Sequence, residues 1–196
     1  MFANRYTALI DACSLASVWR RNLLLTLAEA EFFRVRWSQP ILNETESALV
    51  RMFLKKTKVD SEERAAHAVK SMQSAFPEAL IMDYSHLEHA VIGLPDHDDV
   101  HVVAAAMKTQ AQTIVTENLK HFPASVLDGL NLEARSADDF IADTIALEEG
   151  RAIAAVSRMR RRLQSPAMDP DGMIRSLEAH GLVETASILA QHIRSL

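Results

Sequence analysis

The sequence predicts an α/β fold with a mostly parallel central sheet and a small C-terminal helical extension. Short apolar segments rich in β-branched residues alternate with longer segments whose apolar residues recur at helical spacing, which is typical of βαβ units. From about residue 140 to Leu196, only helical patterns occur. We therefore expect a sheet domain over residues 1–140 and a helical extension over residues 141–196.

Five segments are predicted to be strands. The clearest is residues 113–116, Thr-Ile-Val-Thr, in which every residue is β-branched. Residues 7–10 form a short apolar segment that ends at Asp11, as expected for a buried strand with a polar tip. The other predicted strands are residues 34–37, 79–82 and 131–134.

The predicted helices are bounded by capping and breaking residues. Residues 20–33 carry apolar side chains at helical spacing, and Ser38 with Pro40 is a typical helix start. Residues 60–63, Asp-Ser-Glu-Glu, resemble a capping box that opens a helix ending before Pro77.

Further along the chain, Asp98 or Asp96 is expected to cap a helix, and Asp98 is the preferred cap. Ser136 is expected to cap the first helix of the extension, and Gly181 is expected to end a later one.

The composition is that of a globular protein of ordinary size. The chain has 196 residues, 48% hydrophobic and 24% charged, which suffices for a core. A single cysteine, Cys13, excludes a disulfide framework and a cysteine-based zinc site. No apolar run has the length of a membrane span, and the N-terminus lacks a signal-peptide core. We expect a cytoplasmic protein that does not contact membranes.

The net charge of −5, from 21 basic and 26 acidic residues, argues against a polybasic nucleic-acid binder. A local basic face is still allowed, because phosphate binding needs cations somewhere. The densest basic run is residues 158–162, although such a run is often only a solvated helix face. Other candidate phosphate contacts are Arg20, Arg21, Arg51, Lys55, Lys56 and Lys58.

Acidic and amide side chains from four distant segments are predicted to share one edge of the sheet. Ligands of open parallel sheets bind beyond the carboxyl ends of the strands. The residues expected there are Asp11, Glu44, the group Asp96, Asp98 and Asp99, and the segment Thr116-Glu117-Asn118. Converging carboxylates repel one another unless they share a cation, and Mg²⁺ or Mn²⁺ is the usual solution. One or two such ions can activate water and stabilise a phosphodiester displacement.

Four segments of the chain together resemble the acidic motifs of PIN-domain nucleases, in the order of that family. They are Leu9-Ile10-Asp11-Ala12-Cys13, Ile41-Leu42-Asn43-Glu44, Asp99-Val100-His101-Val102-Val103-Ala104-Ala105-Ala106 and Thr116-Glu117-Asn118-Leu119-Lys120-His121-Phe122-Pro123. The resemblance covers about residues 7–140 and implies a PIN-like three-layer fold. Ser165-Pro166 and Gly181-Leu182 look like the helical extension of one PIN subgroup.

The resemblance implies a Mg²⁺- or Mn²⁺-dependent endoribonuclease, the VapC-type toxin of a toxin–antitoxin pair held inactive by a cognate antitoxin. Carried over by position, Asp11, Glu44 and Asp99 are the catalytic acids and metal ligands. Asp96 and Asn118 complete the expected metal site, with Asn118 standing where the family has a fourth acid. RNA would be the substrate, and the apolar helix faces make a homodimer plausible.

Each candidate also has a structural interpretation. Asp11 would cap a helix, and Glu44 would be a solvated first-turn acid, with Glu46 pointing inward instead. Thr116 would donate its hydroxyl at the site or simply end a strand.

Three other side chains are left out of the predicted site. We expect His97 and His101 to be solvated, as histidines in a polar turn usually are. Cys13 is interpreted as a small buried residue, because no activating pair is evident.

Two rival functions are open. An Asn at the fourth acid position is compatible with a catalytically degenerate interaction module. A phosphotransfer protein also places an Asp after its first strand, but it would need a second Asp two residues on, where Cys13 stands, or an acidic pair before Asp11 together with a late lysine. No such acidic pair precedes Asp11.

Overall fold

The computed structural model describes residues 6–55, 59–164 and 167–196. Lys56, Lys58 and the Ser165-Pro166 pair lie outside the described residues, as does the start of the N-terminal segment in which no signal peptide was expected. The described chain divides into two compact units. The sheet unit contains residues 6–16 and 34–135, and the helical unit contains residues 17–33 and 136–196.

The sheet unit is built on five strands that all pair in parallel, which confirms the predicted α/β class. The strands are β1 (Thr7–Ile10), β2 (Arg34–Ser38), β3 (Leu80–Ile81), β4 (Thr113–Val115) and β5 (Glu133–Arg135), in the order β3-β2-β1-β4-β5. Every residue of β1 is buried, as expected for the central strand of a covered parallel sheet. The last strand begins two residues later than predicted, because Asn131 takes a left-handed conformation at φ 55°.

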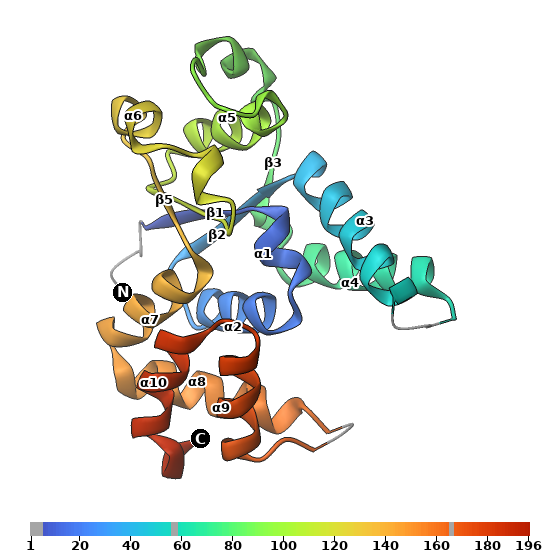
Figure 1. Cartoon of the computed structure of the whole chain (residues 1–196), viewed down its shortest axis with the longest axis vertical. Helices are drawn as coiled ribbons and strands as arrows, with labels where there is room; N and C mark the ends of the chain where they lie inside the picture. Colours follow the sequence, from blue (N-terminus) through green and yellow to red (C-terminus); the bar gives the residue numbers. More distant parts are fainter. Residues whose placement is uncertain (1–5, 56–58, 165–166) are drawn as a thin grey trace. The chain divides into compact units, whose positions relative to one another are not determined.

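The strand order reverses between β1 and β4. The chain runs outward from β1 to β2 and β3, and then returns to place β4 on the other side of β1. Right-handed crossovers in opposite directions place α3 (Gln39–Lys55) and α5 (Val100–Lys108) on opposite faces of the sheet (Figure 1). Ile10 pairs with Val115, so the carboxyl ends of β1 and β4 lie side by side. This is the position at which open α/β sheets bind ligands.

The remaining elements of the sheet unit are short except for α4. They are α1 (Ala12–Ala16), α4 (Ser61–Ala75), α6 (Ala124–Leu127) and the 3-10 helices η1 (Pro77–Ala79), η2 (Ser85–Ala90), η3 (His97–Asp99), η4 (Leu119–His121) and η5 (Asp128–Leu130). Ser38 accepts a hydrogen bond from the Ile41 N–H at 3.4 Å, which confirms the predicted start of α3. The predicted end of α4 before Pro77 is also confirmed.

Two predicted caps are wrong. Asp60 precedes α4 in a left-handed conformation at φ 63°, so its carboxylate makes no capping hydrogen bond and the capping box does not form. Asp98 was the preferred cap near residue 97, but it is Asp96 that accepts a hydrogen bond, from the Asp98 N–H at 3.1 Å. The extended backbone of Asp96 is the conformation that an N-cap needs, whereas Asp98 already lies inside η3.

The helical unit contains α2 (Val18–Glu29), α7 (Ala137–Leu147), α8 (Glu149–Arg162), α9 (Pro170–Ala179), α10 (Val183–Gln191) and the 3-10 helix η6 (Ile193–Ser195). Ser136 caps α7 by accepting the Asp139 N–H at 3.1 Å, and Gly181 ends α9 at φ 77°, both as predicted. The predicted domain boundary between residues 140 and 141 falls within α7. The assignment of folding domains stays a prediction.

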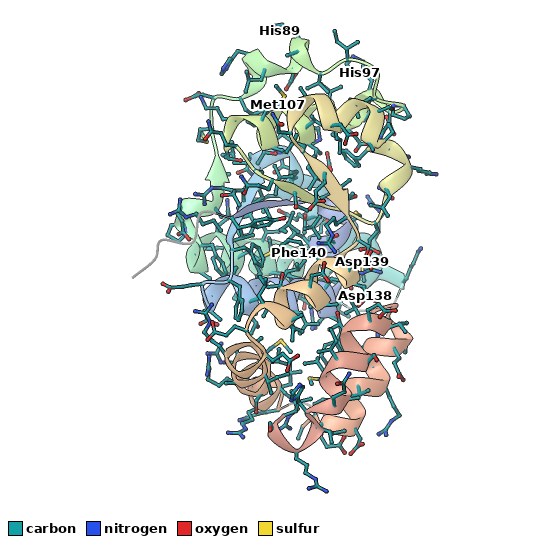
Figure 2. The ribbon with its side chains drawn as sticks, turned by 90° about the vertical axis from the view of Figure 1, so that its left-hand side faces the viewer. His89, His97, Met107, Asp138, Asp139 and Phe140 are labelled. Carbon is teal, nitrogen blue, oxygen red and sulfur yellow. The ribbon has the colours of Figure 1, made fainter. Side chains whose placement is uncertain are left out.

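Leucines and isoleucines from all parts of the helical unit form its core. Fully buried examples are Leu23, Leu24, Leu27, Ile141, Ile145, Leu177, Leu182 and Leu189. The Asp138 carboxylate accepts the N–H groups of Glu184 and Thr185, each at 2.9 Å, and so caps α10 from α7 (Figure 2). Among the described residues, no helix is both long and apolar enough to cross a bilayer.

Candidate active site

Asp11 occupies the switch point between β1 and β4 and is held by three hydrogen bonds. Its side chain is only 4% exposed. One carboxylate oxygen accepts the Ala12 N–H at 2.6 Å. The other accepts the Thr116 hydroxyl at 2.7 Å and the Cys13 thiol at 3.0 Å. Buried charges need such partners, and here the partners fix the direction in which the carboxylate points.

Thr116 positions Asp11. Its hydroxyl is fully buried after β4, donates to Asp11 and accepts the Asn118 N–H at 3.1 Å. From the sequence, Thr116 would either donate its hydroxyl at the site or simply end a strand. In the structure, the hydroxyl instead orients the carboxylate of Asp11. Burial, followed by the Asp11 charge, raises the pKa of the Cys13 thiol to about 11. Cys13 therefore stays protonated near neutral pH and is not a nucleophile there.

Asp96, Asp99 and His121 form the densest cluster of candidate ligands in the described structure. One ligand atom from each lies within 4.8 Å of the other two. Nδ1 of His121 lies 2.8 Å from Oδ2 of Asp99 and 3.5 Å from Oδ2 of Asp96. Asp96 caps η3 and Asp99 is its last residue, whereas His121 ends η4, which follows β4. Two segments far apart in the sequence thus meet at one point.

Burial raises the pKa of Asp99, and the charges of Asp11 and Asp96 raise it further. The hydrogen bond and charge of His121 oppose this shift without cancelling it. The charged form of Asp99 is therefore disfavoured, first by burial and then by the neighbouring carboxylates.

Glu44 lies on the surface of α3 and is linked to α5 through a histidine. Nε2 of His101 lies 3.1 Å from Oε1 of Glu44. Burial lowers the pKa of His101, but the Glu44 hydrogen bond and the charges of Glu44, Asp11 and Asp99 outweigh it, so the net pKa is raised. The expectation that His101 is solvated is therefore wrong, since its side chain is only 17% exposed. His97 is exposed, as expected.

Asn118 differs from the other predicted site residues. It is exposed, its N–H donates to Thr116, and its carbonyl accepts the His121 N–H at 2.8 Å. Its backbone therefore orders the turn that carries His121. His121 was not among the predicted site residues, although it stands in the same segment as Thr116 and Asn118. The signal for His121 in the sequence was its position, six residues beyond the end of β4 at the switch point.

The residues at this edge fit a divalent cation. Within residues 6–55, 59–164 and 167–196, the side-chain partners of these acids are histidine, hydroxyl and thiol groups, with no Lys or Arg among them. Carboxylate oxygens and imidazole nitrogens are suitable ligands for divalent metals. Burial, and after it the charges of Asp11 and Asp96, raise the pKa of Asp99, and a bound cation would stabilise its charged form.

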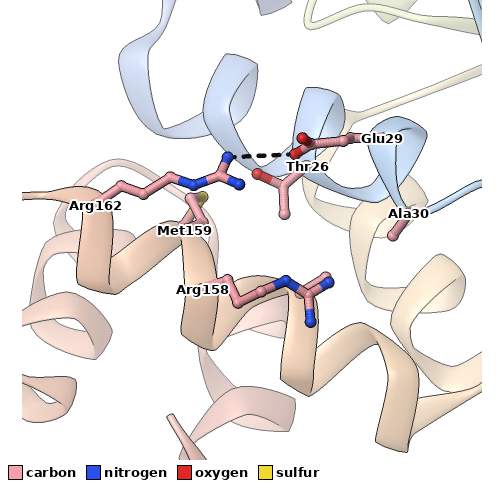
Figure 3. A pocket seen from close by; sticks show the side chains of 7 residues that line it. Thr26, Glu29, Ala30, Arg158, Met159 and Arg162 are labelled. Atoms are coloured by element: carbon pink, nitrogen blue, oxygen red, sulfur yellow. Dashed lines mark hydrogen bonds and ion pairs between the residues drawn. The ribbon is translucent and has the colours of Figure 1, made fainter.

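The basic run of the extension lines a separate pocket in the helical unit. This pocket, about 130 Å³ in volume, lies between α2 and α8 (Figure 3). Arg162 donates to Glu29 across it at 3.4 Å, and both side chains are more than half exposed. Thr26, Arg158 and Met159 also line it. The pocket has cations but no buried ionisable group, so it gives no sign of catalysis.

Comparison with known proteins identifies the sheet unit. The family model of the PIN domain matches residues 7–120. The chain belongs to the PIN domain family. A second family model, described as the VapC50 C-terminal domain, matches residues 137–191. The expected resemblance of both parts of the chain is thereby confirmed.

One curated relative of this PIN protein is described as "Putative ribonuclease VapC50" from Mycobacterium tuberculosis (strain ATCC 25618 / H37Rv). It is 36% identical over 81 residues, which are 41% of this chain and 48% of the relative. The alignment thus spans about half the length of that relative. No solved structure matches the chain.

Proposed function

We propose that this PIN protein is a metal-dependent endoribonuclease that hydrolyses RNA phosphodiester bonds, with Mg²⁺ or Mn²⁺ as cofactor. The observation that carries the proposal is the meeting of Asp96, Asp99 and His121 within 4.8 Å, in the electrostatic reach of Asp11. Family membership and the name of the relative support the reaction class. When bound, the cation would neutralise phosphate charge and make water a better nucleophile.

In this proposal, Asp11, Glu44 and Asp99 are the catalytic acids, and Asp96 and Asn118 assist at the metal site. The chain's own contribution is to hold these groups in position before RNA arrives. Thr116 and the Ala12 N–H fix Asp11, His101 holds Glu44, and His121 holds Asp99. Preorganised charge of this kind lowers the reorganisation needed at the transition state.

The biological part of the proposal is a toxin that acts in the cytoplasm and is restrained by a cognate antitoxin. It is supported by the match of residues 137–191 to the VapC50 C-terminal domain and by the name of the relative. A homodimer belongs to the same proposal. A neighbouring gene for a small DNA-binding partner would favour the toxin assignment.

The test is RNA cleavage by the purified chain, free of any partner, with Mn²⁺ present. Asp99→Asn should remove cleavage and relieve growth inhibition in cells, because Asn keeps the shape but not the charge. Asp98→Asn is the matched control, since Asp98 is the exposed neighbour of Asp99 and should leave both intact.

The rival interpretation is a degenerate module that binds partners without catalysis. It would be favoured if the wild-type chain cleaved no RNA with Mn²⁺ and calorimetry detected no metal binding that Asp11→Asn removes. Phosphoryl transfer from a reactive phosphodonor to Asp11 would instead favour a phosphotransfer protein.

A further inference from the structure

His121 stands in the position of a ligand. Its Nδ1 faces Oδ2 of Asp99 at 2.8 Å and Oδ2 of Asp96 at 3.5 Å. The backbone that carries the ring is ordered, because the backbone N–H of His121 donates to the Asn118 carbonyl in the turn of η4. The imidazole is one-quarter exposed, so one side faces solvent while Nδ1 faces the acids.

The spacing of these atoms matches that of adjacent ligands on one cation. Octahedral coordination at about 2.1 Å places neighbouring ligand atoms about 3 Å apart. The two measured separations from Nδ1 lie on either side of that value. In the metal-free protein, Nδ1 of His121 and Oδ2 of Asp99 lie within hydrogen-bond distance of each other. A cation bound by both atoms would need the lone pair of Nδ1, with the ring hydrogen on Nε2.

We propose that His121 is a nitrogen ligand of the active-site cation, and that it shifts the preference of this site from Mg²⁺ towards Mn²⁺ and related transition metals. The inference rests on the proposed metal-dependent function and extends it to the identity of the ion. Mg²⁺ favours all-oxygen surroundings, whereas an imidazole ligand suits transition metals. The competing interpretation is that His121 only positions Asp99 through a hydrogen bond.

Mn²⁺ is the probe that separates these interpretations, since it is paramagnetic. Pulsed electron paramagnetic resonance on the full chain with Mn²⁺ should show coupling to a directly bound nitrogen. Calorimetry with Mn²⁺ and with Mg²⁺ gives the affinity ratio. His121→Asp, which restores an all-oxygen set, should remove the nitrogen coupling and lower the Mn²⁺/Mg²⁺ affinity ratio about tenfold.

A second variant and a control distinguish the loss of a metal ligand from misfolding of the variant. His121→Gln should also remove the coupling, and circular dichroism checks that both variants fold. His89→Gln is the control, because His89 is exposed on η2 (Figure 2) and is not a member of the cluster of Asp96, Asp99 and His121. It should keep both the coupling and the affinity ratio of the wild type.

The outcomes separate this inference from the proposed function. Bound Mn²⁺ without nitrogen coupling, together with RNA cleavage, overturns the role of His121 and leaves the ribonuclease proposal standing. Coupling that survives in His121→Gln assigns the nitrogen to another residue, such as His101, and also overturns it. Absence of any Mn²⁺ binding contradicts both proposals.

Discussion

The acidic edge of the sheet unit and the arginine-lined pocket of the helical unit both contain charged side chains, but these side chains are held differently. At the sheet edge, Asp11 is 4% exposed and accepts hydrogen bonds of 2.6 to 3.0 Å. In the pocket, Arg162 and Glu29 meet at 3.4 Å with side chains 66% and 60% exposed. Exposed pairs of this kind contribute little, because water and salt screen them.

The difference shows which charges the fold keeps under constraint. In the pocket, the negative charge of Glu29 is paired with the positive charge of Arg162, which is an ordinary arrangement on a protein surface. The sheet edge instead brings like charges together and orients them with hydroxyl, thiol and imidazole groups. Such an arrangement works against stability, and it is typical of functional sites. The following experiments test the contrast.

Asp11→Asn should have the largest effect. We expect RNA cleavage with Mn²⁺ to fall about 100-fold or more, because the central carboxylate loses its charge while its size is kept. The measurement is the initial rate on a labelled RNA. Asp83→Asn is a matched control at another strand end, exposed after β3, and should cleave like the wild type. If RNA cleavage fell equally in both variants, the special role that we assign to Asp11 would be wrong.

Thr116→Val should have the next largest effect. Valine has the shape of threonine but lacks the hydroxyl that donates to Asp11 at 2.7 Å. We expect about a tenfold loss of cation affinity by calorimetry, and a loss of about 1–3 kcal/mol in the free energy of unfolding. Thr116→Ser, which keeps the donor, should recover most of the affinity. If serine and valine behaved alike, the positioning role of the hydroxyl would be wrong.

His101→Gln should have a smaller effect, visible as a change in pH dependence. The net pKa of His101 is raised in the folded protein, so its protonation stabilises the fold below pH 6.5 and is lost as the pH rises through the raised pKa. The metal-free wild type should therefore lose stability above pH 6.5. Urea unfolding at several pH values should show a flatter profile for His101→Gln. A wild-type stability that rises over the same interval would contradict this sign.

Arg162→Met should have the smallest effect. Its pair with Glu29 is exposed and long, so we expect a change within about 0.5 kcal/mol in the free energy of unfolding. The methionine keeps the aliphatic packing against the pocket. Thermal unfolding at low and high salt measures the effect. A loss above about 2 kcal/mol in the free energy of unfolding would mean that this exposed pair stabilises the fold as much as the hydrogen bonds of Asp11 do, and would contradict the contrast.

Local signals in the sequence predicted much of the fold. β-branched residues marked β4, Ser136 marked the start of α7, and Gly181 marked the end of α9. The left-handed Asp60 was missed, because its conformation depends on how the chain enters α4 and not on its own side chain. That α2 belongs to the same compact unit as the C-terminal helices is a long-range packing result, which no local pattern contains.

The candidate site was predictable where a strand end marks it. Asp11 and Thr116 follow β1 and β4, so the parallel order alone brings them together. His121 and His101 were not predictable, because their roles depend on how η4 and α5 turn a ring towards an acid. The protonation of Cys13 is likewise a result of burial beside Asp11.

The pairing of β1 with β4 also determines when the site can form while the chain is being synthesised. Asp11 acquires its Thr116 hydroxyl only after 105 residues of chain have closed into one loop, and that loop includes α3 and α5. Closing it is a non-local step in folding, which costs more chain entropy than a local contact does. During synthesis on the ribosome, Asp11 is therefore present for most of the time without the Thr116 hydroxyl that orients it. Under the proposed function, a nascent or truncated chain is harmless to RNA until the segment that ends at His121 has emerged and docked.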